Sequence, residues 1–214
     1  MRHLFAPLTI CLLTLSAQAS QAREWKFDQA ETGKLPPGWS SAHMGEGPGS
    51  VWKVLEDPSA PSKSKVLAQT SSEGADDFFN LCVADDVNQQ DVDLSVKFKA
   101  VSGKNDQGGG LVWRYRDANN YYIARMNPLE GNFRVYKVEN GKRTQFESAD
   151  VKIPAGEWHA LRVVQRGNRI ECYLDGKHYL SATDDTFTKA GKIGLWSKSD
   201  AISHFDDLTL LDPK

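Results

Sequence analysis

Hydrophobic and polar residues alternate along much of the chain with the two-residue period of a β-strand. The clearest case is Asp91–Ala100, where Val92, Leu94, Val96 and Phe98 share one face and charged or hydroxyl residues occupy the other. This pattern predicts a strand with one face on a core and the other in water.

Shorter runs of β-branched and aromatic residues, bounded by turn residues, predict further strands along the chain. They are Glu24–Asp28, Val51–Glu56, Val66–Gln69, Phe78–Ala84, Trp158–Arg166, Arg169–Leu174, Tyr179–Thr183, Lys192–Ser197 and Ile202–Leu211. The segment from Asp28 to about Gly49, rich in Pro and Gly, is expected to be loop. Roughly fourteen strands and no amphipathic helix predict an all-β, two-sheet antiparallel sandwich.

The central stretch Gly108–Val138 predicts a three-stranded antiparallel meander with turns at Asp117–Asn120 and Pro128–Gly131. Pairing Arg116 with Tyr121 across the first turn assigns the side chains of the first two strands to two faces. Leu111, Trp113, Tyr115, Tyr122, Ala124 and Met126 fall on a core face, and Val112, Arg114, Arg116, Tyr121, Ile123 and Arg125 on an open face expected to meet solvent.

Across the second turn, Asn127 pairs with Asn132, which adds Arg134 and Tyr136 to the open face and directs Lys137 toward the core. Phenol rings can stack on sugars and guanidinium groups can donate paired hydrogen bonds, so this face suits carbohydrate. The alternative is an ordinary solvated face. The predicted ligand-binding residues are Arg114, Arg116, Tyr121, Arg125, Tyr136 and also Trp196, which alternation places opposite Ile193 and Leu195.

The first residues have the features of a secretory signal peptide. Arg2 precedes the apolar run Leu4–Leu15, and Ala17-Gln18-Ala19 offers a cleavage site, with Ala22 as the alternative. This pattern predicts a leader over residues 1–19, one domain over residues 20–214, and a periplasmic or secreted protein. Cleavage removes Arg2 and takes the formal net charge from −2 to −3. A protein of this charge has no strong positive potential that would attract nucleic acid.

Beyond the leader, no stretch is apolar and long enough to cross a bilayer. Cys82 and Cys172 remain after cleavage. They could form one disulfide in an oxidising compartment, or be two buried free thiols, which their apolar neighbours favour. No feature of the sequence indicates the oligomeric state.

Several segments resemble the concanavalin A-like and laminin G-like jelly rolls: GGLVWRYRDANNYYIAR, YKVENGKR, YLDGK and GKIGLWSKSDAISHFDDL. Within that superfamily the chain is similar to bacterial secreted proteins called laminin G-like or 3-keto-disaccharide-hydrolase-like. The resemblance runs from about Trp25 to Leu210. It implies two curved antiparallel sheets, with ligands on the concave face or on loops at its rim.

Motifs for catalysis are not found. Glycoside hydrolases of this fold place acids in a Glu-x-Asp-x-Glu strand, whereas this chain offers only Asp91-Val92-Asp93. The 3-keto-disaccharide relatives often have Asn-Ser-Gly-Ile where this chain has Gly109-Gly110-Leu111-Val112. Gly108-Gly109-Gly110 lacks the Lys-Ser/Thr of a phosphate loop, and close strand packing explains it. No catalytic residue is therefore assigned.

The histidines of the mature chain (His43, His159, His178 and His204) show no metal-ligand spacing. The resemblance implies a different site, because many such jelly rolls hold a structural calcium with an Asp of the last strand. Asp206 and Asp207 match that position, and carboxylate oxygens suit calcium. The alternative is hydrogen bonding that stabilises the final strand. No other cofactor is required.

The leading hypothesis is an exported, non-catalytic jelly roll that binds a carbohydrate or cell-surface glycan through the Arg/Tyr face. A second hypothesis, from the resemblance alone, is an enzyme that acts on a modified (3-keto) disaccharide. A third is a protein-interaction module of the cell envelope.

Overall fold

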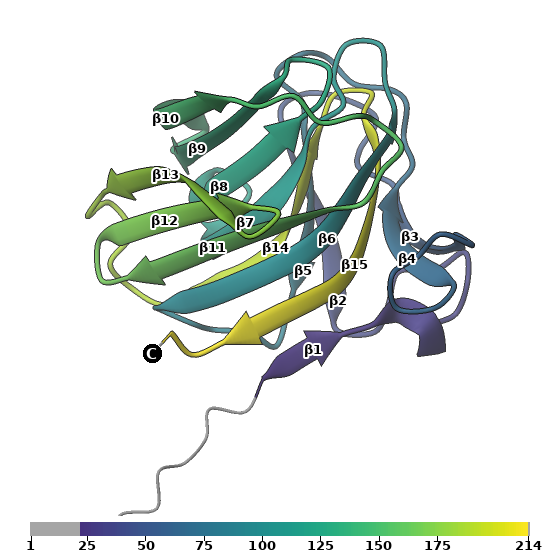
Figure 1. Ribbon diagram of the computed structural model, residues 1–214, viewed down its shortest axis with the longest axis horizontal. Coiled ribbons are helices and arrows are strands. Elements are labelled where there is room, and N and C mark those ends of the chain that lie inside the picture. Colours follow the sequence, from purple (N-terminus) through teal and green to yellow (C-terminus); the bar gives the residue numbers. More distant parts are fainter. Residues whose placement is uncertain (1–21, 214) are drawn as a thin grey trace, which may run out of the picture.

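A computed structural model describes residues 22–213 as two antiparallel sheets packed face to face, which confirms the predicted sandwich (Figure 1). Sheet A runs in the order β13 (Lys177–Thr183), β12 (Arg169–Leu174), β11 (His159–Arg166), β6 (Val92–Ser102), β15 (Ile202–Leu211), β4 (Lys65–Gln69) and β3 (Trp52–Glu56), with β1 (Arg23–Trp25) on β15. Sheet B runs β10 (Lys142–Asp150), β9 (Asn132–Glu139), β8 (Asn120–Asn127), β7 (Gly109–Asp117), β14 (Lys192–Lys198), β5 (Phe79–Ala84) and β2 (Trp39–Met44).

Two elements differ from the prediction near the start of the chain. The strand expected over Glu24–Asp28 ends at Trp25 and is followed by a single 3-10 turn, η1 (Phe27–Gln29). Strand β2 lies in the segment expected to be loop. It escapes pattern analysis because it is an edge strand with several polar residues, paired to β5 on one side.

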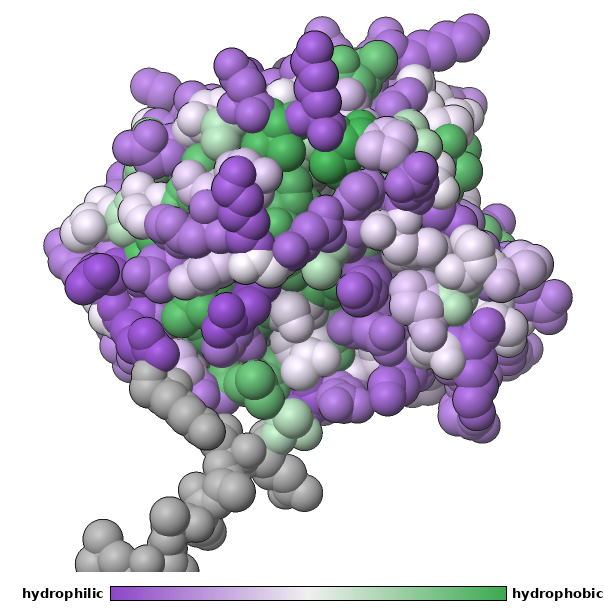
Figure 2. Space-filling model, in the orientation of Figure 1, coloured by the Kyte–Doolittle hydropathy of each residue, from purple (hydrophilic) through white to green (hydrophobic). Residues whose placement is uncertain are grey.

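The predicted leader lies outside the described residues. Among residues 22–213, no helix is long and apolar enough to span a membrane. On the face drawn in Figure 2, apolar side chains show only in small areas between charged and polar ones.

The main core lies between the two sheets. Phe98 and Phe205 of sheet A pack with ring centroids 5.6 Å apart, and Trp113 stacks on Tyr122 in sheet B at 5.6 Å. Cys82 and Cys172 are both free and fully buried here, and burial raises the pKa of each thiol. The interpretation as buried free thiols therefore agrees with the structure.

Close packing explains the glycine triplet at the start of β7. A Cβ on Gly109 would lie 2.1 Å from Cε2 of Phe98, across the core. One on Gly110 would lie 2.3 Å from the carbonyl oxygen of Ala124 on the paired strand. A larger residue at Gly109 would displace the Phe98 ring, and one at Gly110 would push β8 away from β7.

The pairing of β8 with β9 is as predicted. Asn127 lies opposite Asn132 and Ile123 opposite Tyr136, so Lys137 does point toward the core side. The ammonium group of Lys137 is accommodated at the edge of the sandwich, where its Nζ donates to Thr186 (2.6 Å) and lies 3.4 Å from the Asp184 carboxylate.

The predicted register of β7 on β8 agrees with the pair at the first turn but is wrong by two residues beyond it, where Val112 and not Arg114 lies opposite Ile123. Trp113 pairs with Tyr122, but the next pair is Asp117 with Asn120, so β7 carries two extra residues. Arg114 takes a left-handed φ of 45° in this bulge. The bulge reverses the faces of two residues: Arg114 turns into the end of the sandwich, while the Tyr115 ring lies 5.8 Å from that of Tyr121 on the opposite face.

Arg114 joins four segments at that end of the sandwich. Its Nε donates to the carbonyl of Gln90 (2.7 Å), and its two Nη atoms donate to the carbonyls of Phe187 and Gly167 and to the Asp91 carboxylate. Only 2% of its side chain is exposed. Arg114 is thus a structural residue, not part of an open face.

Sheet B is strongly curved, and the face turned away from sheet A is concave. In a flat sheet, β10 and β5 would be about 24 Å apart, since five strand spacings of ~4.8 Å separate them. Yet the guanidinium of Arg143 on β10 lies 4.8 Å from the ring centroid of Phe79 on β5. We call this surface the curved face of sheet B.

Candidate functional site

The curved face carries a second apolar layer, separate from the main core. Its buried members come from β5, β7, β8, β9 and β14, so that strand after strand contributes to one continuous surface: Phe79, Leu81, Val83, Val112, Tyr121, Ile123, Val138 and Trp196. Tyr121, Ile123 and Trp196 are fully buried and Arg125 and Tyr136 nearly so. The expectation that this face meets solvent is therefore wrong, because curvature packs its side chains against one another.

Arg143 covers part of this layer. Its guanidinium lies 4.8 Å from the ring centroids of both Phe79 and Tyr136. Tyr136 also accepts a hydrogen bond from Nη2 of Arg125 at 3.2 Å. Aromatic rings and guanidinium groups therefore alternate over the centre of the curved face.

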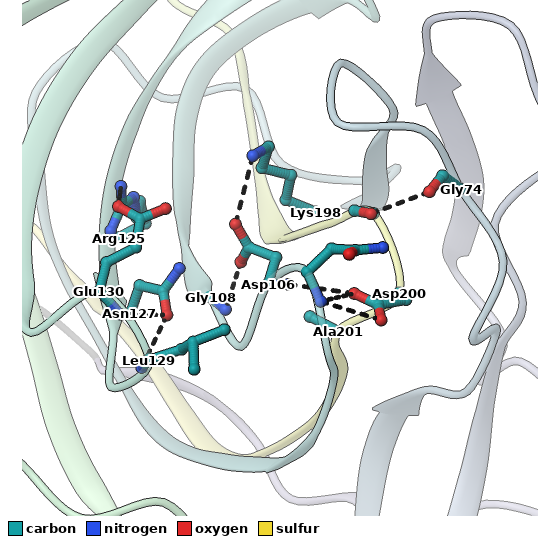
Figure 3. A network of polar contacts seen from close by, with 12 residues as sticks. Gly74, Asp106, Gly108, Arg125, Asn127, Leu129, Glu130, Lys198, Asp200 and Ala201 are labelled. Carbon is teal, nitrogen blue, oxygen red and sulfur yellow. Dashed lines mark hydrogen bonds and ion pairs between the residues drawn. The ribbon is translucent and has the colours of Figure 1, made fainter.

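A polar cluster continues this face at the end where β8 meets β9. Its members, drawn in Figure 3, are Asp106, Arg125, Asn127, Glu130 and Lys198. The Asp106 carboxylate points toward Lys198, with 3.4 Å between Oδ2 and Nζ. Glu130 accepts from Arg125 Nη2 at 2.8 Å.

The polar cluster and the aromatic layer meet at Gly108. A Cβ on this residue would lie 2.7 Å from Oδ1 of Asp106, 3.5 Å from the Trp196 ring and 3.8 Å from Cβ of Asn127. Glycine is therefore needed where these three side chains converge, and the two groups form one site.

Two turns hold the polar cluster in place. The Asp200 carboxylate accepts the backbone N–H groups of Lys104, Asn105 and Asp106 at 2.7–3.1 Å, which fixes the loop before β7 (Figure 3). In the turn between β8 and β9, Oδ1 of Asn127 accepts the N–H of Leu129 at 3.0 Å. The acidic side chains are thus carried on loops whose backbones are fixed by hydrogen bonds.

The pKa values of the two carboxylates of the cluster are shifted in opposite directions, because their neighbours differ. Burial raises the pKa of Asp106 above its usual value, although the Gly108 N–H and Lys198 favour the charged form. Burial also disfavours the charged form of Glu130, but Arg125 and the Asn132 amide outweigh it and hold the pKa of Glu130 low. Asp106 is thus the stronger base of the pair.

Several buried polar atoms of this site have no hydrogen-bond partner in the described part of the chain. They include Nδ2 of Asn127 and Nη1 of Arg143. The Trp196 indole nitrogen and the Tyr121 hydroxyl also fall short of good hydrogen-bond geometry, but they lie close enough to interact with each other. Leaving a buried donor unpaired costs about 1–3 kcal/mol. Solvent reaches the cluster through Glu130 and Arg134, whose side chains are 34% and 31% exposed.

The structure gathers four of the six predicted ligand-binding residues on the curved face: Tyr121, Arg125, Tyr136 and Trp196. Arg114 and Arg116 lie elsewhere: Arg116 is exposed, with its guanidinium 4.8 Å from the Phe187 ring.

Sequence reasoning missed Asp106, Lys198 and Arg143. Alternation from Trp196 could have found Lys198, and pairing across Asn140-Gly141 could have found Arg143. Asp106 lies in a loop, where side chains do not alternate between two faces as they do in a strand.

Asp206 is fully buried at the predicted calcium position. Its carboxylate accepts the N–H of Ser62 and of Asp207, both at 2.8 Å. Within the part of the chain that the structure describes, no group of three or more His, Cys, Asp or Glu side chains is arranged to hold a metal ion. Side chains alone therefore do not fit the six to eight oxygens that calcium takes.

The calcium site stays a prediction that chelation tests. A bound structural calcium would make the melting temperature fall by several degrees in excess EDTA and return on adding calcium, because an ion that binds only the folded state stabilises it. An unchanged melting temperature leaves Asp206 as a hydrogen-bonding residue of the last strand.

Comparison with known proteins places the chain in a family. The model of the 3-keto-alpha-glucoside-1,2-lyase-like domain matches residues 26–211, which is most of the sequence. The chain belongs to this family. The expected similarity to 3-keto-disaccharide-hydrolase-like proteins is thereby confirmed.

Solved structures confirm the jelly-roll fold. The carbohydrate binding module CBM66 from Bacillus subtilis aligns with a TM-score of 0.63 at 20% identity, over 80% of this chain and 94% of the module. The Bacillus licheniformis β-glucanase aligns with a TM-score of 0.52 at 12% identity, over 92% and 100%. A levanase of Bacillus subtilis (strain 168) is 28% identical over 120 residues, which span 55% of this chain and 16% of the levanase.

Proposed function

We propose that this family member is an exported domain that binds carbohydrate on the curved face of sheet B. The observation that carries the proposal is the pair of unpartnered polar atoms at this site, Nδ2 of Asn127 and Nη1 of Arg143. Sugar hydroxyls both donate and accept hydrogen bonds, so a bound sugar would satisfy such atoms. Export is supported by the leader-like pattern of residues 1–19.

The surroundings of these atoms suit a sugar ring. Arg125, Glu130 and Lys198 provide charged hydrogen-bonding groups, and Tyr136 provides an aromatic surface. Leu129, which is 51% exposed at the edge of the cluster, adds an apolar contact for C–H groups. The similarity to a carbohydrate binding module and to a levanase is in line with this role.

Binding is tested by affinity electrophoresis and calorimetry with a panel of polysaccharides that includes α-glucans and levan. Lys198→Met is expected to weaken binding roughly tenfold, because it removes one charge-assisted hydrogen bond. Lys177→Met, on an exposed position of sheet A, is the matched control and should bind normally. Failure of every glycan in the panel to bind the wild type would contradict the proposal.

A second function is favoured by Asp106, a buried carboxylate of raised pKa beside an ammonium group. The family description suggests 1,2-elimination from a 3-keto-α-glucoside. Ionised Asp106 would remove the proton at C2, next to the ketone. The C2–H electron pair would form the C1=C2 bond while the C1–O bond breaks, and the departing alcohol oxygen would take a proton from water, to which Asp106 returns the proton from C2. Lys198 is available to stabilise negative charge on the ketone oxygen.

Elimination is tested by incubating the protein with a 3-keto-α-glucoside and following release of the alcohol. Asp106→Asn should lower the turnover rate by roughly 10²–10⁴-fold, since it removes the base. The exposed Asp185→Asn is the control. Because the base must be ionised, turnover should fall as the pH drops through the raised pKa of Asp106. An unchanged rate in Asp106→Asn would overturn this second function.

A further inference from the structure

An arginine without a direct ion pair lies over the centre of the curved face. Within residues 22–213, the Arg143 side chain has neither an ion pair nor a hydrogen bond, and its Nη1 is buried. The group is held by the rings of Phe79 and Tyr136, each with its centroid 4.8 Å from the guanidinium carbon. Nη1 therefore has no acceptor among the described side chains.

The carboxylates near Arg143 are already paired with other groups. Asp106 lies beside Lys198 and accepts the Gly108 N–H at 2.6 Å. Glu130 lies 2.8 Å from Arg125 and 3.3 Å from Arg134. The site therefore holds more cations than anions: Arg125, Arg134, Arg143 and Lys198 against Asp106 and Glu130.

Arg143 is partly buried, and aromatic rings compensate the desolvation of a cation only in part. A cation over a ring gains about 0.5–2 kcal/mol, whereas removing a charge from water costs several. In line with this deficit, burial lowers the pKa of Arg143. An anionic acceptor at Nη1 would supply both the missing hydrogen bond and the missing charge.

We propose that Arg143 binds the carboxylate of an acidic sugar, so that the ligands of this site are carbohydrates containing uronic acid. A guanidinium presents a planar fork that matches the two oxygens of a carboxylate, and the Phe79 and Tyr136 rings limit how far that fork can turn. This inference rests on the proposed carbohydrate site and names its ligand class.

The test compares three probes that differ at one carbon: methyl α-glucuronide, its neutral amide and methyl α-glucoside, each titrated into the full chain by calorimetry at low salt. The glucuronide should bind at least tenfold more tightly than the other two. Arg143→Gln should reduce this preference to less than twofold. Arg169→Gln, which removes an exposed arginine of sheet A that is paired with Glu171, should retain it. Thermal melts confirm that each variant is folded.

The outcomes separate this inference from the proposed function. Equal binding of glucuronide, amide and glucoside by the wild type would overturn acidic-sugar recognition and leave carbohydrate binding intact. A preference that survives in folded Arg143→Gln would overturn the role of Arg143. Tighter binding of a sulfated glucoside than of the glucuronide would overturn the carboxylate class. The comparison of the glucuronide with its amide needs only the wild-type protein. It therefore tests acidic-sugar recognition even if Arg143→Gln does not fold.

Discussion

Replacing Arg114 with alanine is expected to lower the free energy of unfolding by about 3–5 kcal/mol. The buried guanidinium bonds the carbonyls of Gln90, Gly167 and Phe187, and these acceptors would lose their donor. Such a loss is a large share of the roughly 5–15 kcal/mol that stabilises a domain. Thermal unfolding followed by circular dichroism should show a melting temperature lower by roughly 10 °C.

Arg116→Ala is the matched control, two residues along the same strand. Its side chain is exposed, has no hydrogen bond or ion pair within residues 22–213, and places its guanidinium 4.8 Å from the Phe187 ring, so the expected loss is about 0.5–1 kcal/mol. If both variants melt within a degree of the wild type, the structural role of Arg114 is wrong.

Trp196→Ala is expected to lower the free energy of unfolding by about 3–5 kcal/mol, as for other large-to-small changes in a core. Trp196 is fully buried on the curved face, with its ring centroid 5.3 Å from that of Phe79. Truncation would leave a cavity in the second apolar layer. Urea unfolding should show a lower midpoint concentration. If the dependence of the unfolding free energy on urea concentration (the m value) matches that of the wild type, the variant differs in stability alone.

Trp158→Ala provides the comparison, because Trp158 is only half-buried and donates its indole N–H to Ser59 at 3.0 Å. Its expected cost is about 1 kcal/mol. Equal loss in the two variants would argue that the curved face does not form a packed layer.

Alternation predicts the face of a residue only while a strand keeps regular pairing. Val112, Ile123 and Arg125 lie on the face predicted for them, and even the charged Lys137 points coreward as the second turn requires. The prediction fails at Arg114 and Tyr115, where the bulge reverses the two faces. Nothing in the local sequence distinguishes this bulge from a regular hairpin.

The site itself depends on the shape of the whole sheet. Alternation could place Tyr121 and Trp196 on one face, but not show that curvature buries them. Asp106 reaches the cluster from a loop fixed by Asp200, a residue 94 positions away. Arg143 meets Phe79 only because β10 bends toward β5. These contacts are set by sheet geometry, which a linear pattern does not contain.

The two free cysteines have a consequence for how the protein can be observed. A thiol must ionise and be reached before it can attack a disulfide or a labelling reagent. Cys82 in β5 and Cys172 in β12 are both fully buried, and burial keeps them protonated. In an oxidising compartment the folded chain should therefore be inert, and labelling would occur only as the sandwich opens. One thiol lies in each sheet. Equal labelling rates at Cys82 and Cys172 would therefore show that both sheets become accessible in the same opening event, whereas unequal rates would show that one sheet opens alone.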